Sequence, residues 1–276
     1  MKTIGIIALS GTVNKNKLEK SVANLEQLGF NVELSKNIFD KDRYLAGSDE
    51  DKLEELHRFF SDPKFDIVMA ARGGYGAIRL INKIDYDLIK KNPKPFVGFS
   101  DVTALLLMIY RRAGIITYHG PMACSDFSEV SNFTSENFYK ALQCEKLEFE
   151  GDKIYREGAA EGIIWGGNLA TVVSLCGQDF IPDEDFVFFA EDLNEPAYKI
   201  DRMFTQLFNI EKFKANCKGI VLGDFLDTDN QEWLEEFFYA FPLPTAGGFK
   251  ITHAKDKITI PIGKKCNLER ANLVIY

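Results

Sequence analysis

The sequence predicts an α/β protein with a parallel sheet in its N-terminal half, followed by a smaller, largely β, mixed domain. Two observations lead to this fold class. Apolar segments alternate with segments of helical periodicity through the first half, which is typical of parallel strands joined by crossover helices. The second half also contains strands and helices, but in a less regular order. With 276 residues, 46% of them hydrophobic and 27% charged, the chain can bury a substantial core.

The first half contains four expected strands and three expected helices before residue 100. A helix over residues 16–28 is predicted because Leu18, Val22, Leu25 and Leu28 recur at spacings of three and four. The expected strands are residues 4–8, 31–34, 66–71 and 95–98, and the other two helices are residues 50–60 and 77–81.

The pattern becomes polar and aromatic from residue 124 to 153, and we interpret this region as a connector. It includes a helix start for which Thr134 or Ser135 is the expected cap. Beyond it, strands are expected at residues 161–169, 186–190 and 219–223, and helices at residues 200–208 and 231–239. The predicted organisation is a first domain over 1–125, a connector over 126–158 and a second domain over 159–276.

Charge and composition favour a small-molecule or peptide ligand. The net charge is −8, and no basic stripe typical of a nucleic-acid binder is visible. The N-terminal apolar run is short and fits a buried strand better than a signal peptide, and no segment is apolar enough to span a membrane. We therefore expect a cytoplasmic protein with no nucleic-acid or membrane partner. Reduced thiols are expected for all five cysteines, Cys124, Cys144, Cys176, Cys217 and Cys266.

Ser100 is a candidate nucleophile. It lies where a strand ending at Gly98 turns into a helix, so its hydroxyl faces the carboxyl end of the sheet beside the free N–H groups of the first helical turn. Asp101 would supply one of those N–H groups. The alternative is that Ser100 only caps the helix, and Val102 departs from the G-x-S-x-G pattern of α/β-hydrolases.

A second turn, Arg72-Gly73-Gly74-Tyr75-Gly76, follows the preceding strand. Its glycines let backbone amides approach a ligand closely. They could bind an anion, or Gly73 or Gly74 could supply a second oxyanion donor; a simple tight turn is the alternative. Arg72 is a candidate partner for a substrate carboxylate, and Tyr75 is expected to contact substrate.

A serine nucleophile needs a base, and the chain contains three histidines. His57 lies in an amphipathic helix, and His119 is expected to order a loop. His253 lies in a loop after Gly247-Gly248 and is the preferred base. Glu191 ends the apolar strand 186–190 and could orient that histidine; a solvated loop acid is the alternative. With no zinc-type histidine spacing, no metal or cofactor is expected.

Together these segments resemble the L,D-carboxypeptidase family of serine peptidases, the muramoyltetrapeptide carboxypeptidases. The resemblance covers nearly the whole chain. The motifs that carry it are Arg72–Gly76, Gly98–Leu105, His119-Gly120-Pro121, Gly166-Gly167-Asn168-Leu169, Glu191-Asp192, Tyr198–Arg202 and His253 ahead of Pro261-Ile262-Gly263.

The resemblance implies a Ser100–Glu191–His253 triad. It also implies a Rossmann-like N-terminal domain carrying the nucleophile, a largely β C-terminal domain carrying acid and base, and an active site between the domains. The implied reaction releases the terminal D-alanine of a murein tetrapeptide during cell-wall recycling, by a homodimer that needs no metal. Asn168 is expected to contact substrate. One departure is Thr252, where the family usually has glycine before the histidine.

Two other functions are considered. The same superfamily includes microcin-C immunity enzymes, which hydrolyse peptidyl or aminoacyl nucleotides and need an aromatic platform. Trp165 is the candidate for it, and a core residue or loop anchor is the alternative for this side chain. Alternatively, the protein is a non-catalytic module in which Gly73–Gly76 bind an anion. Reaction of Ser100 with an activated phosphonate separates the module from both enzymes.

Overall fold

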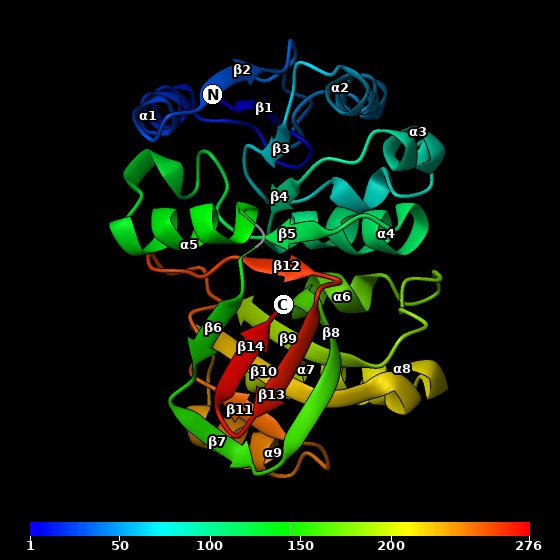
Figure 1. Ribbon diagram of the computed structural model, residues 1–276. Helices are drawn as coiled ribbons and strands as arrows, with labels where there is room; N and C mark the ends of the chain where they lie inside the picture. Colours follow the sequence, from blue (N-terminus) through cyan, green and yellow to red (C-terminus); the bar gives the residue numbers. More distant parts are fainter. Residues whose placement is uncertain (144) are drawn as a thin grey trace. The chain divides into compact units, whose positions relative to one another are not determined.

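A computed structural model describes residues 1–143 and 145–276 (Figure 1). Its internal contacts divide the chain into two units, Met1–Ser135 and Glu136–Tyr276. This division lies within residues 126–158, the segment expected to connect two domains. That segment contains a short 3-10 helix, the whole of α5 and two strands, β6 and β7. Each unit is described by itself below.

The N-terminal unit is built on a parallel sheet with strand order β5-β4-β3-β1-β2, so the predicted parallel sheet is confirmed. Figure 1 shows α1 on one side of these strands and α2, α3 and α4 on the other. The strands are β1 (Thr3–Ile7), β2 (Asn31–Leu34), β3 (Ile67–Ala70), β4 (Phe96–Gly98) and β5 (Thr117–His119). The helices are α1 (Lys15–Gln27), α2 (Asp49–Ser61), α3 (Tyr86–Lys91) and α4 (Thr103–Ala113), with 3-10 helices η1 (Ala77–Arg79), η2 (Ser100–Val102) and η3 (Phe127–Glu129).

The sequence explains this sheet directly. Strands covered by helices on both faces are apolar throughout, and all four residues of β3 are buried. The helices begin at polar caps: the Asn14 side chain accepts from the Lys17 N–H, and Ser48 accepts from the Asp51 N–H. The strand order reverses between β1 and β3. In open α/β sheets the carboxyl edge at such a reversal is the usual ligand-binding crevice.

The C-terminal unit contains a mixed sheet with strand order β6-β14-β13-β8-β9-β10-β11-β7. Its centre, β8 to β11, is parallel, and antiparallel strands flank it on both sides. The strands of this sheet are β6 (Leu147–Glu150), β7 (Lys153–Arg156), β8 (Ala159–Asn168), β9 (Phe186–Leu193), β10 (Cys217–Leu226), β11 (Thr245–Gly247), β13 (Lys265–Glu269) and β14 (Asn272–Ile275). The unit also contains β12 (Ile260–Ile262), which is not part of this sheet. The expected mixed, largely β second half is thus confirmed.

An aromatic core packs the helices of this unit against the sheet. Phe188 of β9 lies edge-on to Phe204 of α7 and Phe213 of α8, with ring centroids 6.1 Å and 5.1 Å away. Such contacts add to the free energy of burying the rings. The helices are α6 (Leu169–Ser174), α7 (Ala197–Phe208), α8 (Glu211–Asn216) and α9 (Gln231–Tyr239).

Three details differ from or extend the expectations. Helix α5 (Asn132–Leu142) begins earlier than predicted. Its cap is Ser131, whose hydroxyl accepts a hydrogen bond from the Thr134 N–H, and not Thr134 or Ser135. Residues 77–81 form only a short 3-10 turn. Cys124, Cys176, Cys217 and Cys266 carry free thiols, and Cys144 lies outside the described residues.

No helix in the part of the chain that the structure describes is long and apolar enough to cross a membrane.

Candidate active site

Ser100 lies directly after β4, where the chain turns into η2 and α4. Its φ of 59° is left-handed, a conformation that costs a non-glycine residue about 1–3 kcal/mol. Neither η2 nor α4 has a side-chain cap hydrogen bond. The structure therefore gives no support to Ser100 as a helix cap, and strain of this kind is often found at functional sites.

Gly73 borders Ser100. A Cβ atom on Gly73 would lie 3.1 Å from the Ser100 Cβ, 3.2 Å from its Oγ and 3.6 Å from the Asp101 nitrogen. Gly74, with φ of 121°, needs the conformational freedom of glycine. The two predicted turns thus meet at the same edge of the sheet, and a role of their N–H groups as oxyanion donors stays a prediction.

Arg72 holds the Gly73 turn in place through two hydrogen bonds. Its Nε donates to the Gly73 carbonyl at 3.0 Å and its Nη1 to the Thr12 carbonyl at 3.2 Å. The Gly11 N–H also donates to the Gly73 carbonyl, at 3.2 Å. The guanidinium therefore ties the turn after β3 to the turn after β1, while a contact between Arg72 and substrate stays a prediction.

The side chain of Asp101 ties the nucleophile turn to η1. Its Oδ2 accepts from the Ala77 N–H at 2.9 Å. Burial raises the pKa of Asp101, although the Ser10 hydroxyl, the Ala77 N–H and the charge of Lys52 oppose that rise. The Asp101 side chain thus has a structural role next to Ser100, separate from the oxyanion role predicted for its backbone N–H.

Sequence reasoning missed Lys52, which acts on Asp101. Lys52 is fully buried, and its Nζ has no hydrogen-bond partner among the described residues. Burial lowers its pKa, against the opposing charges of Asp49 and Asp101. Lys52 precedes Leu56 by four residues and Phe59 by seven, which places it on the buried face of α2, and this was the signal that could have identified it.

Glu191 and His253 lie together in the C-terminal unit. The Nδ1 of His253 lies 2.8 Å from Oε2 of Glu191, whose side chain is fully buried at the carboxyl end of β9. Burial alone would lower the pKa of His253, but the hydrogen bond and charge of Glu191 outweigh it and raise the pKa. This is the geometry by which a carboxylate orients an imidazole and stabilises its cation.

The alternation of β9 separates Glu191 from its neighbour Asp192, because successive side chains of a strand point to opposite faces. Asp192 accepts hydrogen bonds from Asn168 Nδ2 at 2.9 Å, the Ala170 N–H at 2.8 Å and the Leu193 N–H at 2.9 Å. Burial is the main reason that the pKa of Asp192 rises to about 6. Asp192 thus holds the start of α6 through the Ala170 N–H, whereas Glu191 contacts His253.

The loop that carries His253 has hydrogen bonds both before and after this residue. The Asp224 N–H donates to the Ile251 carbonyl at 3.0 Å, and a Cβ on Gly223 would lie 2.1 Å from that oxygen, so only glycine fits. Thr252, the departure from the family pattern, is buried, and its Oγ1 accepts from the Ala254 N–H at 2.9 Å. Its φ is not left-handed, so no glycine is needed there.

Trp165 requires a correction. The ring is fully buried and packs between Phe180, Phe186, Phe188 and Phe213, with centroids 5.1–6.4 Å away. It presents no face to a ligand, so the expected substrate-binding role is not retained. A core position, the alternative for Trp165, fits this packing, with Phe186 and Phe188 coming from the neighbouring β9 and Phe213 from α8.

Asn168 is used inside the protein. Besides donating to Asp192, its Oδ1 accepts from the N–H of Thr171 at 3.1 Å and from its hydroxyl at 2.8 Å. Asn168 thus caps α6, as its position before a helix permits. A contact with substrate stays a prediction.

The other two histidines have local roles. His119 is buried and lies edge-on to Phe99, with ring centroids 5.8 Å apart. The Nε2 of His57 accepts from the Asp85 N–H at 3.0 Å. Residues 1–143 and 145–276 contain no group of three or more His, Cys, Asp or Glu side chains that could hold a metal ion.

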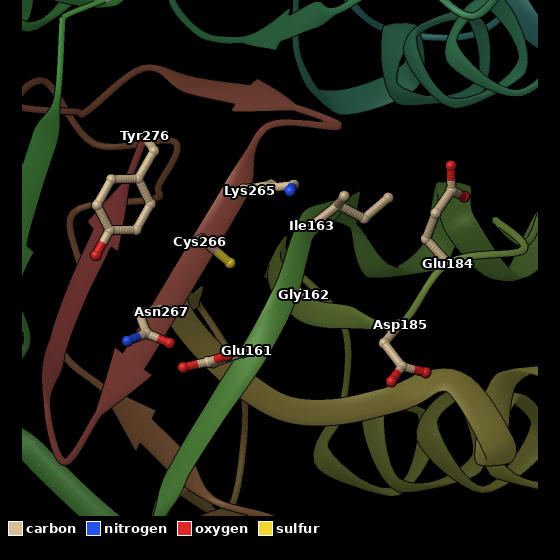
Figure 2. A pocket seen from close by; sticks show the side chains of 9 residues that line it. All are labelled: Glu161, Gly162, Ile163, Glu184, Asp185, Lys265, Cys266, Asn267 and Tyr276. Carbon is tan, nitrogen blue, oxygen red and sulfur yellow. The ribbon is translucent and has the colours of Figure 1, made fainter.

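A pocket of the C-terminal unit lies away from these residues. Figure 2 shows its lining, which comes from β8, β13, the segment before β9 and the last residue. The lining residues are Glu161, Gly162, Ile163, Glu184, Asp185, Lys265, Cys266, Asn267 and Tyr276. None of them is a predicted site residue, and burial raises the pKa of the Cys266 thiol to about 12, which keeps it protonated and unreactive.

Comparisons with known proteins agree with these two halves. The LD-carboxypeptidase N-terminal domain matches residues 4–120, and the LD-carboxypeptidase C-terminal domain matches residues 161–268. A probable murein peptide carboxypeptidase of Bacillus subtilis is 34% identical over 98% of this chain and 89% of its own length. The microcin C7 self-immunity protein MccF of Escherichia coli is 27% identical over 98% of this chain and 91% of its length.

Among solved structures, the muramoyltetrapeptide carboxypeptidase of Oxalobacter formigenes is similar with a TM-score of 0.89 and 28% identity, covering 99% of this chain and 98% of that one. Similarity of sequence and fold therefore extends over nearly the whole chain. The chain belongs to the LD-carboxypeptidase family of peptidases.

Proposed function

We propose that this protein is a serine carboxypeptidase that releases the terminal D-alanine of murein tetrapeptides, with Ser100, His253 and Glu191 as its triad. The observation that carries the proposal is the 2.8 Å contact between His253 Nδ1 and the buried Glu191 carboxylate. A carboxylate held in this way leaves the Nε2 of the same ring to act as a base. The strained Ser100 turn supplies the complementary nucleophile.

In the acylation step, the Oγ of Ser100 attacks the scissile carbonyl carbon and its proton passes to Nε2 of His253. The carbonyl oxygen becomes an oxyanion, which accepts hydrogen bonds from the Asp101 N–H and from the N–H of Gly73 or Gly74. The intermediate collapses as His253 returns the proton to the nitrogen of the leaving D-alanine. Glu191 stays ionised and stabilises the imidazolium.

In the deacylation step, water attacks the acyl-enzyme ester while His253 takes a proton from it. The second oxyanion uses the same N–H donors, and its collapse expels the Ser100 oxygen, which recovers a proton from His253. The products are a shortened peptide with a new carboxylate and the unchanged enzyme. No metal or oxidant enters either step, so the chemistry needs only the residues named.

The murein tetrapeptide as substrate is supported by the relatives named for murein peptide and muramoyltetrapeptide carboxypeptidase activity. The microcin-type hydrolase remains the second candidate because MccF is similar over nearly the whole chain, but the burial of Trp165 argues against this ring as its aromatic platform. The proposal includes a location in the cytoplasm, where murein peptides are recycled. It also includes a homodimer as the working assembly.

The test measures the release of D-alanine from purified tetrapeptide by mass spectrometry. We expect the wild-type protein to remove one alanine, and Ser100→Ala to lower kcat/KM by about 10⁴–10⁶-fold, the usual range for loss of a serine nucleophile. Ser61→Ala, an exposed serine of the same unit, is the control and should not change the rate. Full release by Ser100→Ala would exclude Ser100 as the nucleophile.

Two further arms separate the other functions. Cleavage of aspartyl-sulfamoyl adenosine without cleavage of tetrapeptide would establish the microcin-type hydrolase. A well-folded protein whose Ser100 does not react with an activated phosphonate would be a non-catalytic module. A single phosphonate adduct at Ser100 excludes that module.

A further inference from the structure

Two large aromatic side chains lie exposed together in the N-terminal unit. Tyr44 is 61% exposed and Tyr75 is 47% exposed, yet their ring centroids are only 5.8 Å apart, at an interplanar angle of 56°. A single exposed ring needs no explanation, but two rings that contact each other and still face solvent form a local apolar surface. Tyr44 has no role in the triad chemistry.

The backbone holds both rings in place. Asp42 and Leu45 exchange backbone hydrogen bonds of 2.9 Å in both directions, and Arg43 between them has a left-handed φ of 58°. Leu45 pairs with Gly11 and fills the space over Gly76, where a Cβ would lie 2.9 Å from the Leu45 side chain. The loop that carries Tyr44 is thus packed on the turn that carries Tyr75, which preorganises the pair.

The pair lies at the edge of the sheet that carries the nucleophile. Gly73 contacts Ser100, and Tyr75 follows Gly73 by two residues, a separation of at most about 7 Å between Cα atoms. In a muramoyl-tetrapeptide, three amino-acid residues and a lactyl linker lie between the scissile bond and the pyranose sugar at the amino end. An extended chain of three residues spans about 10–11 Å. The sugar can therefore reach the tyrosine rings when the scissile bond is at Ser100.

We propose that Tyr44 and Tyr75 form an aromatic platform that binds the pyranose ring at the amino end of the stem peptide. The C–H face of a pyranose is apolar and packs on an aromatic face, while the Tyr44 hydroxyl can bond to its polar edge and the Tyr75 hydroxyl interacts with Arg79. The tilt of 56° leaves a corner rather than a parallel-sided slot for a flat base.

Neighbouring charges also favour a neutral ring. Arg43 is paired with Asp42 at 3.3 Å, and Arg79 with Asp49 at 3.0 Å. These cations already have carboxylate partners, so the platform is not arranged to attract the phosphate or sulfamate of a nucleotide. A sugar-bearing peptide is the ligand class that fits both the rings and the charges.

This inference rests on the proposed function for its choice of ligand, so the test measures binding apart from turnover. In the Ser100→Ala background, which keeps the ligand intact, Kd is measured by calorimetry for free tetrapeptide and for N-acetylmuramoyl-tetrapeptide. We expect the sugar to tighten binding, and Tyr44→Ala and Tyr75→Ala each to reduce that preference about tenfold, the size of one lost aromatic contact.

Tyr44→Phe keeps the ring and should retain most of the preference. Tyr239→Ala is the matched control, because Tyr239 is also exposed (57%) and also contacts a tyrosine, Tyr155 at 5.0 Å, in the other unit. The control should leave the preference unchanged.

A sugar preference that is absent, or that both alanine variants retain, overturns the platform. Weaker binding of aspartyl-sulfamoyl adenosine but not of the muramoyl peptide in Tyr44→Ala also overturns it, in favour of a nucleoside site. Failure of the proposed function has a different signature, because wild-type protein would then release no D-alanine even where the sugar preference depends on Tyr44.

Discussion

Glu191 and Asp192 are adjacent carboxylates whose environments give them different tasks. The alternation of β9 directs Glu191 to His253 and Asp192 to the backbone N–H groups at the start of α6. The raised pKa of Asp192, about 6, reflects its burial, and its three hydrogen bonds hold the strand end rather than a reacting group. The residue that serves chemistry is therefore identified by its direction and not by its acidity.

Glu191 sets the pH dependence of the proposed reaction. A general base must be neutral, and Glu191 raises the pKa of His253, so activity falls on the acid side at a pH above the ordinary value of the imidazole. In Glu191→Gln that acid limb should move to lower pH, because the charge that raises the pKa is gone. The plateau value of kcat/KM should fall by about 10³–10⁴-fold, because the imidazole is no longer held in the productive tautomer.

The measurement is kcat/KM for tetrapeptide between about pH 5 and 9, the range in which a histidine titrates. A lower plateau with an acid limb in its original place would mean that His253 is not the group that titrates.

At the scale of elements, the site depends on two turns that meet, after β3 and after β4. Gly73 is the contact, since its missing Cβ leaves room for Ser100. Gly73→Ala should push the Ser100 side chain from its position and lower kcat/KM about 100-fold, the cost of an ångström-scale misplacement. The melting temperature should change little, because the φ of Gly73 is not left-handed.

Gly114→Ala is the complementary control. Gly114 ends α4 with φ of 71° and has open space around it, so alanine should cost about 1 kcal/mol of stability through strain while activity stays. Equal loss of stability in the two variants, with full activity in Gly73→Ala, would contradict the proposed contact.

The elements predicted best from the sequence are those whose signal is local. Helix α9 has the expected bounds, Gln231–Tyr239, and β2 the expected Asn31–Leu34, because periodicity and alternation are written in a few consecutive residues. The pair His253 and Glu191 was also predicted, from strand ends and the family motifs. What failed needs distant partners: Trp165 is buried by segments up to about fifty residues away, and Lys52 matters only because Asp101 lies near it.

For the molecule as a whole, the proposed chemistry is divided between the two units. The N-terminal unit holds Ser100 and the proposed N–H donors at the carboxyl edge of its parallel sheet, and the C-terminal unit holds Glu191 near the carboxyl end of β9 and His253 in the loop between β11 and β12. Each half is fixed by contacts within its unit, so neither has to be ordered by the other. The proposal then requires that a residue of one unit activates a residue of the other.

That requirement gives the last prediction. Ser100 should react with an activated fluorophosphonate in wild-type protein, and His253→Ala should slow this labelling by about 10³-fold, because the hydroxyl loses its base. His57→Ala is the control, since His57 shares a unit with Ser100 but bonds to the Asp85 N–H instead; its labelling rate should match wild type. The rate is measured by intact-protein mass spectrometry at a pH where the base is neutral. Equal labelling of His253→Ala and wild type would mean that Ser100 owes its reactivity to its own turn alone, and that the triad does not operate across the units.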